Sequence, residues 1–393
     1  MIDLSKHPTL KYILFGDLYF SEGLILALTT VILVLFFTEK DISISTTTIV
    51  GGIASIPWVM KFVYGPTIDF FSKYGRKNFI FLGGIIGALS IFLIAFIDPN
   101  TSIALFTVFL FMGHFGVVLL DVTADAWAIQ ITKKSERGKI NSAMTTGFFL
   151  GTAIGSVLLT YIATHFGFET VFITSSFLIF LTIILPIFVR EKRIEIKRKI
   201  IGPLLVSEFK KRNTQLVALF GFVVTINFGV LKFVIPEYMA DVLILDKIQI
   251  GVLTALYYIS IVIGSFIGGI SSDIFGRKKI LYITLSGLLI SSGLLITADS
   301  WEKIALIYSS IGIFMGASIY SAGSALVMDI TNPKISGSQY SFLASISNFG
   351  GTGIGMISGT LVLILGYNRF FLYSAWIICP ALLILYFIKE KKN

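Results

Sequence analysis

The chain has little charge and almost no cysteine or histidine. Only 13% of its 393 residues are Asp, Glu, Lys or Arg, about half of the share usual in soluble domains, whereas 55% are apolar and mean hydropathy is +0.89. A soluble fold of this composition would expose large apolar patches and aggregate. The single Cys379 excludes a disulfide within the chain, and the three histidines exclude a histidine-rich metal site. A lipid bilayer is therefore the expected solvent.

Twelve apolar runs are long enough to cross a membrane, because a helix needs about 20 such residues to span about 30 Å of hydrocarbon. The runs lie at about 12–37, 46–68, 78–97, 102–126, 138–163, 168–189, 214–236, 248–272, 278–297, 303–328, 338–364 and 369–388. The first eleven residues are polar and no small-residue cleavage site follows the first run, which indicates a retained helix and not a signal peptide. We predict an all-α membrane protein with twelve transmembrane helices.

The basic residues are distributed unevenly among the loops. The two termini and every even-to-odd loop hold 25 of the 31 Lys and Arg, the opposite loops hold four, and Lys61 and Lys232 lie within spans. Basic loops face the cytoplasm, so both termini are predicted to be cytoplasmic. The net charge of +9 is thus a topology signal, and its expected partner is anionic lipid headgroups and not nucleic acid.

The two halves of the chain repeat in sequence. Three matches share nearly one offset: Asp69 with Asp273 and Asp125 with Asp329, each 204 residues apart, and Gly151-Thr152-Ala153-Ile154-Gly155 with Gly351-Thr352-Gly353-Ile354-Gly355, 200 apart. We predict six-helix bundles at 1–189 and 214–393 and a basic cytoplasmic linker at 190–213 that has room for an amphipathic helix. Parallel halves are typical of transporters whose substrate lies between them. The repeated glycines predict tight helix packing.

A loop motif links the repeat to a known family. After the eighth run it reads Gly269, Asp273, Gly276, Arg277, Lys278, and after the second run Gly65, Asp69, Gly75, Arg76, Lys77 with three extra residues. The motif resembles the signature of the major facilitator superfamily. In the N-terminal half, Pro57–Asp69, Asp121–Trp127 and, more weakly, Leu18–Leu24 are similar to the branch of bacterial muropeptide permeases and acetyl-coenzyme A transporters. The resemblance implies rocking of two halves and an amphipathic, partly anionic solute.

Four residues are candidates for proton coupling. The i,i+4 spacing of Asp121 and Asp125 places both carboxylates on one helix face, and an intramembrane carboxylate that titrates is what proton coupling requires. Asp125 could instead pair with a basic residue of the following loop. Glu22 lies well inside the first predicted helix and could face a central cavity. His114, two turns before Asp121, could relay protons or serve as a packing residue.

Five residues are candidates for substrate binding. Lys61 and Lys232 would suit an anionic solute, although each could snorkel to the interface, and Lys61 could pair with Asp121 or Glu22. Asn227, Tyr257 and Asn348 could line a cavity or hydrogen-bond between helices.

The loop motif itself predicts a conformational latch. Its members would be Gly65, Asp69, Arg76, Gly269, Asp273 and Arg277. A carboxylate at a helix end can accept hydrogen bonds from a facing helix N-terminus and from an Arg, and such a contact made in one conformation only would bias alternating access. The alternative is that these residues only set topology and anchor headgroups.

These features predict a secondary transporter of the cell membrane that carries a small-molecule solute by proton-coupled symport. Phosphate-loop, zinc-site and nucleophile-elbow patterns are absent from the sequence, so we expect no catalytic residues, metal or cofactor, and a gradient as the energy source. We expect the protein to function as a monomer. Efflux of drug-like or lipid-like compounds by proton antiport is the alternative, although neither glycine repeat contains the proline of the antiporter motif. A membrane sensor or scaffold is the non-transport alternative, and an enzyme would have to be built on the Asp121, Asp125 and His114 face.

Overall fold

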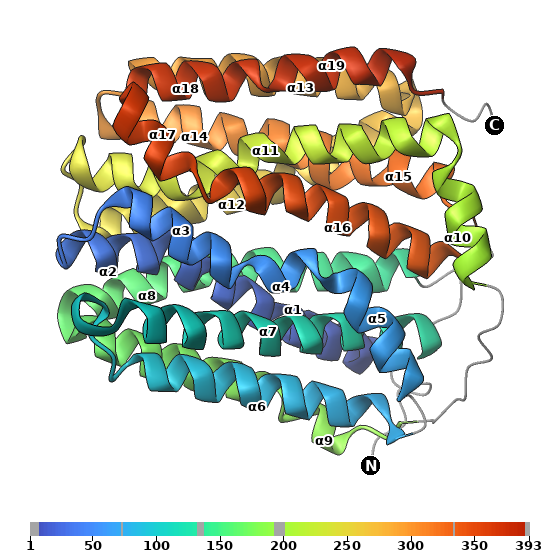
Figure 1. The fold of residues 1–393 in the computed structure, drawn as a ribbon, viewed down its shortest axis with the longest axis horizontal. Helices are drawn as coiled ribbons and strands as arrows, with labels where there is room; N and C mark the ends of the chain where they lie inside the picture. Colours follow the sequence, from blue (N-terminus) through green and yellow to red (C-terminus); the bar gives the residue numbers. More distant parts are fainter. Residues whose placement is uncertain (1–7, 72–73, 132–136, 192–200, 333–334, 390–393) are drawn as a thin grey trace. The chain divides into compact units, whose positions relative to one another are not determined.

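The computed structural model describes residues 8–71, 74–131, 137–191, 201–332 and 335–389, and its elements are helices (Figure 1). The chain divides into two compact units. Unit 1 comprises Met1–Ile42 and Ile53–Lys197, and unit 2 comprises Ser43–Gly52 and Arg198–Asn393. A short piece of the early chain, 43–52, thus packs with the later half.

The elements from the first part of the chain include several breaks. They are α1 (Pro8–Ala27), the π-helix η1 (Leu28–Ile32), α2 (Leu33–Glu39), α3 (Ile44–Ala54), α4 (Ile56–Val59), α5 (Lys61–Phe70), α6 (Arg76–Ile94), α7 (Pro99–Ile131), α8 (Arg137–Thr182) and α9 (Leu185–Phe188). The predicted run at 46–68 is divided into α3, α4 and α5. Ser55 and Met60, with ψ of −4° and 8°, separate the pieces, and Pro57 removes an N–H donor from the first turn of α4.

Helix α8 is two helices joined at a glycine. Its 46 residues would make a straight rod of about 70 Å, more than twice the thickness of the hydrocarbon layer. Gly167 interrupts it with φ 80° and ψ 168°, a conformation that only glycine adopts readily. The break lies between the predicted runs 138–163 and 168–189.

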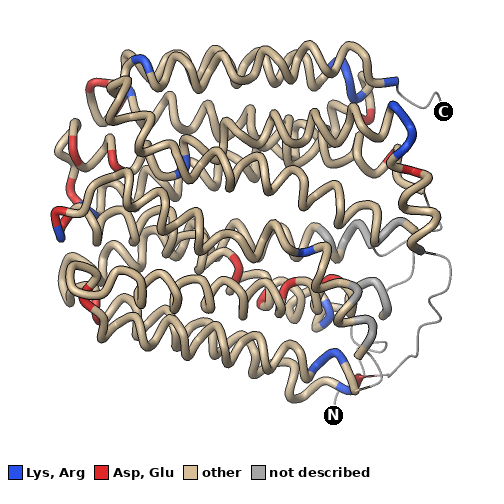
Figure 2. Tube along the Cα trace, in the orientation of Figure 1, with Lys and Arg blue, Asp and Glu red and all other residues tan. Residues whose placement is uncertain are grey.

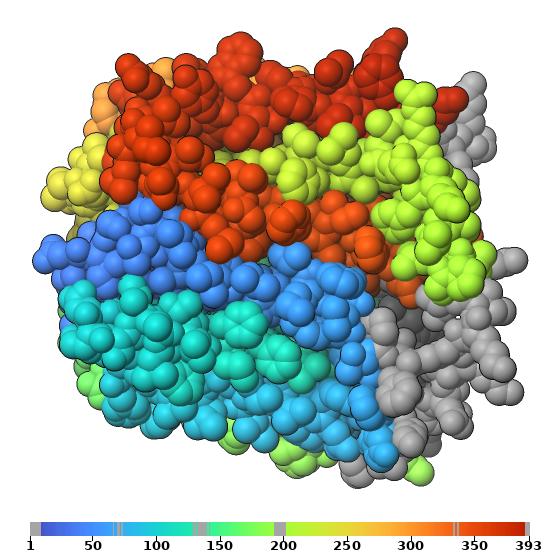
Figure 3. Space-filling view, in the orientation of Figure 1, coloured from blue at the N-terminus to red at the C-terminus, as the bar shows by residue number. Residues whose placement is uncertain are grey.

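The elements from the later part of the chain include both long and short helices. They are α10 (Ile201–Phe209), α11 (Arg212–Asp241), α12 (Lys247–Phe275), α13 (Arg277–Leu294), η4 (Leu295–Thr297), α14 (Trp301–Met315), the π-helix η5 (Gly316–Gly323), α15 (Ser324–Ile330), α16 (Ser336–Gly355), α17 (Ser358–Leu365), α18 (Tyr367–Trp376) and α19 (Ile378–Phe387). Helix α10 lies in the segment predicted as a linker, of which 192–200 falls outside the described residues. Phe209 of α10 packs edge-on against Phe342 of α16, and Figure 3 shows the two helices next to each other at the surface.

The described residues contain ten helical stretches that are long and apolar enough to cross a membrane. Figure 2 shows that Lys, Arg, Asp and Glu gather near the helix ends and that few lie along the middle of the helices. Large apolar side chains such as Leu89 of α6 and Phe266 of α12 are exposed. Apolar faces with charged ends are what a bilayer requires, and the chain is a multi-pass membrane protein.

Glycines let helices touch backbone to backbone in both units. A Cβ atom added at Gly151 of α8 would overlap the Phe20 carbonyl group of α1, and one at Gly229 of α11 would overlap the Gly351 carbonyl group of α16. One at Gly355 would lie 2.7 Å from the Gly229 carbonyl oxygen. The tight packing predicted from the glycine repeat is therefore confirmed, and the same device joins α1 to α8 and α11 to α16.

This packing yields a matched pair of substitutions in α16. Gly350→Ala should lower the thermal unfolding midpoint by several degrees, because the new Cβ would overlap the Phe222 carbonyl group, and such overpacking costs about 1–3 kcal/mol. Gly353→Ala is the control, since its Cβ would make ordinary contacts of 3.5 Å or more with Phe349. Unfolding is measured on purified protein in detergent. Equal midpoints for the two variants would contradict the backbone contact.

Candidate functional site

A cluster of ionisable side chains lies inside unit 1, contributed by α1, α5 and α7. The Lys61 ammonium is 2.5 Å from the Asp121 carboxylate, measured from Nζ to Oδ2, and the two side chains are 19% and 1% exposed. One helical turn further along α7, Asp125 accepts a hydrogen bond of 2.6 Å from the Tyr19 hydroxyl of α1. The two aspartates therefore share a helix face but have different partners. Of the alternatives open to Lys61, the structure shows the pairing with Asp121.

The cluster holds more carboxyl groups than ammonium groups. Glu22 of α1 lies beside Asp121, so that three carboxyl groups surround the single ammonium group of Lys61. Asp121 Oδ1 and Glu22 Oε2 are buried and accept no hydrogen bond within the described part of the chain. An uncompensated carboxylate is costly to bury in a medium of low dielectric constant. Uptake of a proton would remove that cost, which makes the cluster suited to proton binding.

His114 of α7 is bonded through both ring nitrogens. Its Nδ1 accepts from the Trp58 indole N–H of α4 at 2.8 Å, and its Nε2 is 2.7 Å from the Thr29 hydroxyl of η1. The indole ring of Trp58 in turn lies under the Lys61 ammonium, with Nζ 4.7 Å from the ring centroid. His114 thus connects to the charge cluster through Trp58.

Lys232 of α11 is the second lysine within a span, and its surroundings differ from those of Lys61. Its ammonium lies 4.8 Å from the ring centroid of Phe233 and 6.0 Å from that of Phe228. No Asp or Glu of the described residues forms an ion pair with it. Ring faces stabilise a cation only partly. An ammonium inside a membrane span without a carboxylate partner is a candidate site for an anionic group.

The other substrate candidates of unit 2 make packing contacts. Asn227 is fully buried and donates to the Ser374 carbonyl at 2.9 Å. Tyr257 is also buried; it stacks on Tyr308 with centroids 4.1 Å apart and donates to a methionine sulfur. Asn348 is half-buried in α16. For Asn227 and Tyr257 these contacts favour the helix-to-helix alternative.

The loop motif makes its contacts within each unit. In unit 2, Arg277 pairs with Asp329 of α15 and, at 3.8 Å, with Asp273. Gly269 is close to Ser321 of η5. In unit 1, a Cβ added at Gly65 would meet no described atom within 4 Å, and the side chain of Asp69 lies outside the described residues. Arg76 is buried, and its backbone N–H donates to Glu191 at 2.6 Å.

The lysine of the motif has the same role in both units. Lys77 donates to the Val189 carbonyl at 2.7 Å, at the end of the last helix of unit 1. Lys278 donates to the Ile388 carbonyl at 2.8 Å, just after the last helix of unit 2. Both lysines thus satisfy carbonyl groups that a helix end leaves without partners.

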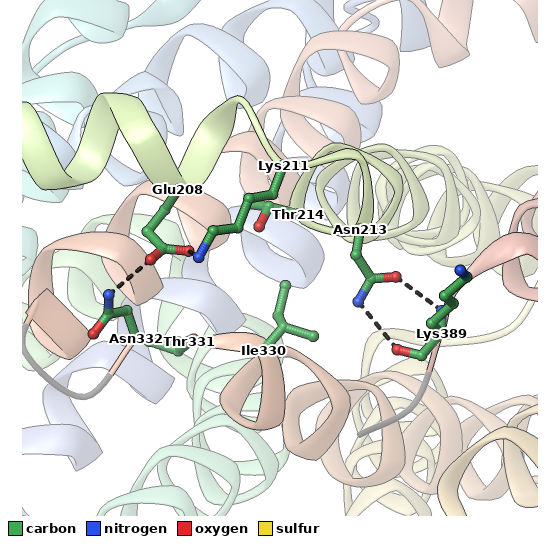
Figure 4. A pocket seen from close by; sticks show the side chains of 8 residues that line it. All are labelled: Glu208, Lys211, Asn213, Thr214, Ile330, Thr331, Asn332 and Lys389. Atoms are coloured by element: carbon green, nitrogen blue, oxygen red, sulfur yellow. Dashed lines mark hydrogen bonds and ion pairs between the residues drawn. The ribbon is translucent and has the colours of Figure 1, made fainter. Parts of the chain in front are cut away.

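Unit 2 also contains a polar pocket of about 380 Å³ at the helix ends (Figure 4). It is lined by Glu208, Lys211, Asn213, Thr214, Ile330, Thr331, Asn332 and Lys389. Glu208 is neutralised by Lys211 at 2.6 Å and accepts from Asn332 at 2.7 Å, while the Asn213 amide exchanges two hydrogen bonds with the backbone of Lys389. These contacts join α10 and the C-terminal segment to the transmembrane helices, so the pocket lies at a structural junction.

Several residues of the site escaped the sequence analysis. Tyr19, Thr29 and Trp58 were not candidates, and neither were Glu191 and the capping lysines. Trp58 had a usable signal, because it precedes Lys61 by three residues and therefore could share a helix face with it. Thr29 and Glu191 had none, since their partners lie 85 and 115 residues away.

Comparison with known proteins gives the family. A model of the Major Facilitator Superfamily matches residues 18–221 and 217–393. The chain is 23% identical to the transporter AmpG 1 of Rickettsia conorii, covering 91% of this chain and 92% of that one. It is 22% identical to the anhydromuropeptide permease of Escherichia coli, covering 93% and 77%. A solved D-xylose–proton symporter has the same fold, with a TM-score of 0.76 at 16% identity, covering 98% and 97%.

The chain therefore belongs to the major facilitator superfamily, and it is a membrane transporter. The resemblance to muropeptide permeases, predicted from motifs of the N-terminal half, extends over almost the whole chain.

Replacing Lys61 should lower the stability of the protein more than replacing Asp121, because the cluster has one ammonium group and three carboxyl groups. Lys61→Gln should lower the free energy of unfolding by about 3–5 kcal/mol, because it leaves the buried carboxylate of Asp121 without its cation. Asp121→Asn should lower the free energy of unfolding by less, because Lys61 still has the carboxyl groups of Glu22 and Asp125 nearby. Denaturant unfolding at neutral pH measures both. A larger loss of unfolding free energy for Asp121→Asn than for Lys61→Gln would contradict the excess of carboxyl groups in the cluster.

Proposed function

We propose that the protein is a proton-coupled symporter for a small anionic solute and that the Lys61–Asp121 cluster is its coupling site. The observation that carries the proposal is the excess of carboxyl groups around Lys61 inside unit 1. When both carboxyl groups are ionised, Asp121 and Glu22 compete for the ammonium of Lys61. When one of them is protonated, it no longer attracts the ammonium, and the competition ends. Protonation and the position of Lys61 are thus linked.

The same proposal includes the membrane topology. We infer twelve crossings with both termini in the cytoplasm, six in each of the halves 1–189 and 214–393, moving against each other in alternating access. The ten long stretches support this number if Ser142–Phe188 is counted as two crossings at Gly167 and the broken run α3–α5 as one. The distribution of Lys and Arg supports the orientation. The named functions of the relatives favour transport over catalysis.

For the solute we propose an anhydromuropeptide or a related compound that carries a carboxylate. The Escherichia coli relative is named an anhydromuropeptide permease, and Lys232 offers this chain an ammonium that no described carboxylate neutralises. An anionic solute would supply the missing charge. Lys61 is already paired, so the two lysines have different roles: Lys61 in coupling and Lys232 in binding.

Proton coupling is tested in liposomes that contain a pH-sensitive dye. Adding an anhydromuropeptide outside should acidify the lumen with the native protein. Asp121→Asn should abolish this signal and keep counterflow exchange of labelled solute, because exchange needs binding but no net proton movement. Asp98→Asn is the control, since it breaks an exposed pair with Lys40. Uptake of labelled solute by the native protein without acidification would overturn proton coupling.

The role of Lys232 is tested by comparing solutes of different charge. Lys232→Gln should raise KM for the carboxylate solute by about tenfold or more, because a charged hydrogen bond contributes about 1.5–3 kcal/mol. An analogue with the carboxylate converted to an amide should be transported equally by native protein and variant. Lys303→Gln, at an exposed lysine paired with Asp299, is the control. Equal effects on both solutes would show that Lys232 does not recognise the anionic group.

A further inference from the structure

The hydrogen bonds of His114 assign its tautomer. The Trp58 indole nitrogen always carries its hydrogen and is a donor only, so His114 Nδ1, at 2.8 Å, must accept. The Thr29 hydroxyl donates to the Ile25 carbonyl at 2.7 Å, so its oxygen is left to accept from His114 Nε2, also at 2.7 Å. The ring is therefore neutral, with its proton on Nε2.

This arrangement is poorly suited to a proton relay. A second proton on Nδ1 would point one N–H group at another and break the bond to Trp58. His114 is 2% exposed, so water cannot replace the lost partner. A relay needs a lone pair that is open to an incoming proton, whereas Nδ1 already accepts from a group that cannot release it.

Trp58 needs such an anchor because of where it lies. It belongs to α4, a helix of four residues between the breaks at Ser55 and Met60. So short a helix has almost no stability of its own. The bond to His114 ties this piece to α7, which also carries Asp121. The orientation of the indole ring is thereby fixed relative to that carboxylate.

Lys61 receives its position from this ring. It is the first residue of α5, directly after the break at Met60, and its ammonium lies 4.7 Å from the Trp58 centroid while it contacts Asp121 at 2.5 Å. A lysine has four rotatable side-chain bonds, and a cation–π contact restricts them without competing for the carboxylate. The ring face thus holds the ammonium at the acid.

We propose that His114 and Trp58 are positioning residues, which hold the Lys61 ammonium at Asp121, and that His114 stays neutral throughout transport. The proposal rests on the coupling role proposed for the cluster. It deepens that role, because it names the residues that fix the geometry. The groups that face the Lys61 ammonium are Asp121, Glu22 and Asp125, and Tyr19 is bonded to Asp125. The pH profile of transport should then arise from the carboxyl cluster and not from the imidazole of His114.

Three variants separate positioning from relay in the liposome assay. His114→Asn keeps an acceptor toward Trp58 but cannot carry a proton. It should retain a large part of the uptake, with the native pH profile. His114→Phe and Trp58→Phe each remove the bond, and each should lower uptake by about tenfold. Loss of uptake in His114→Asn as complete as in His114→Phe, with all variants unfolding at similar temperatures, would overturn the proposal.

A spectroscopic test does not depend on transport. In protein whose other three tryptophans are replaced by phenylalanine, the fluorescence of Trp58 is followed between about pH 5 and 8, where imidazole normally titrates. An imidazolium beside an indole quenches its emission, so no quenching due to His114 is expected. A change that persists in His114→Asn arises in the carboxyl cluster and agrees with the proposal. A quench that disappears in His114→Asn would show a protonating ring and overturn it, whether or not the protein couples protons.

Discussion

A charge inside hydrocarbon must have a partner within reach, and the ion pair between Lys61 and Asp121 shows how much of unit 1 serves this requirement. The pair needs α5 to start beside α7, which the break at Met60 allows. It needs an orientation for the lysine, which Trp58 supplies. In unit 2 the equivalent need is not met by the described residues, because Lys232 has only ring faces. The two halves share a sequence repeat, but the lysine within a span has a carboxylate partner in unit 1 and none among the described residues of unit 2.

The structure contains both close backbone contacts between helices and breaks within a helical run. Where Gly151 meets α1 and Gly229 meets α16, backbones touch, so the paired helices can hardly slide or rotate against each other. The run 44–70, by contrast, is cut into three pieces, and its central piece relies on a side-chain hydrogen bond. The proposed coupling lysine thus lies on a broken run, in contrast to the glycine-packed helix pairs.

Much of this could be read from sequence, because hydrocarbon imposes simple rules. Apolar runs marked the helices, the spacing of Asp121 and Asp125 placed both on one face, and a carboxylate partner was one of the alternatives for Lys61. The rules failed for contacts that depend on how helices rotate about their axes. Asp125 accepts a hydrogen bond from Tyr19, which its spacing from Asp121 does not indicate. Its possible partners in the following loop, Arg137 and Lys139, have side chains outside the described part of the chain. For His114, the sequence left relay and packing open, because its partners Trp58 and Thr29 lie 56 and 85 residues away in the chain.

The capping lysines carry a mechanical consequence. Lys77 and Lys278 each begin near the N-terminus of the third long helix of a half and end on the carbonyl groups of its last helix. A strut between the third and the sixth member of a bundle resists shear between them. Glu191, one residue beyond Arg190, ties the outgoing chain to the same place. The start of α6 therefore holds both the end of the last helix of unit 1 and the chain that leaves it, so that neither can shift without displacing the third helix of the bundle.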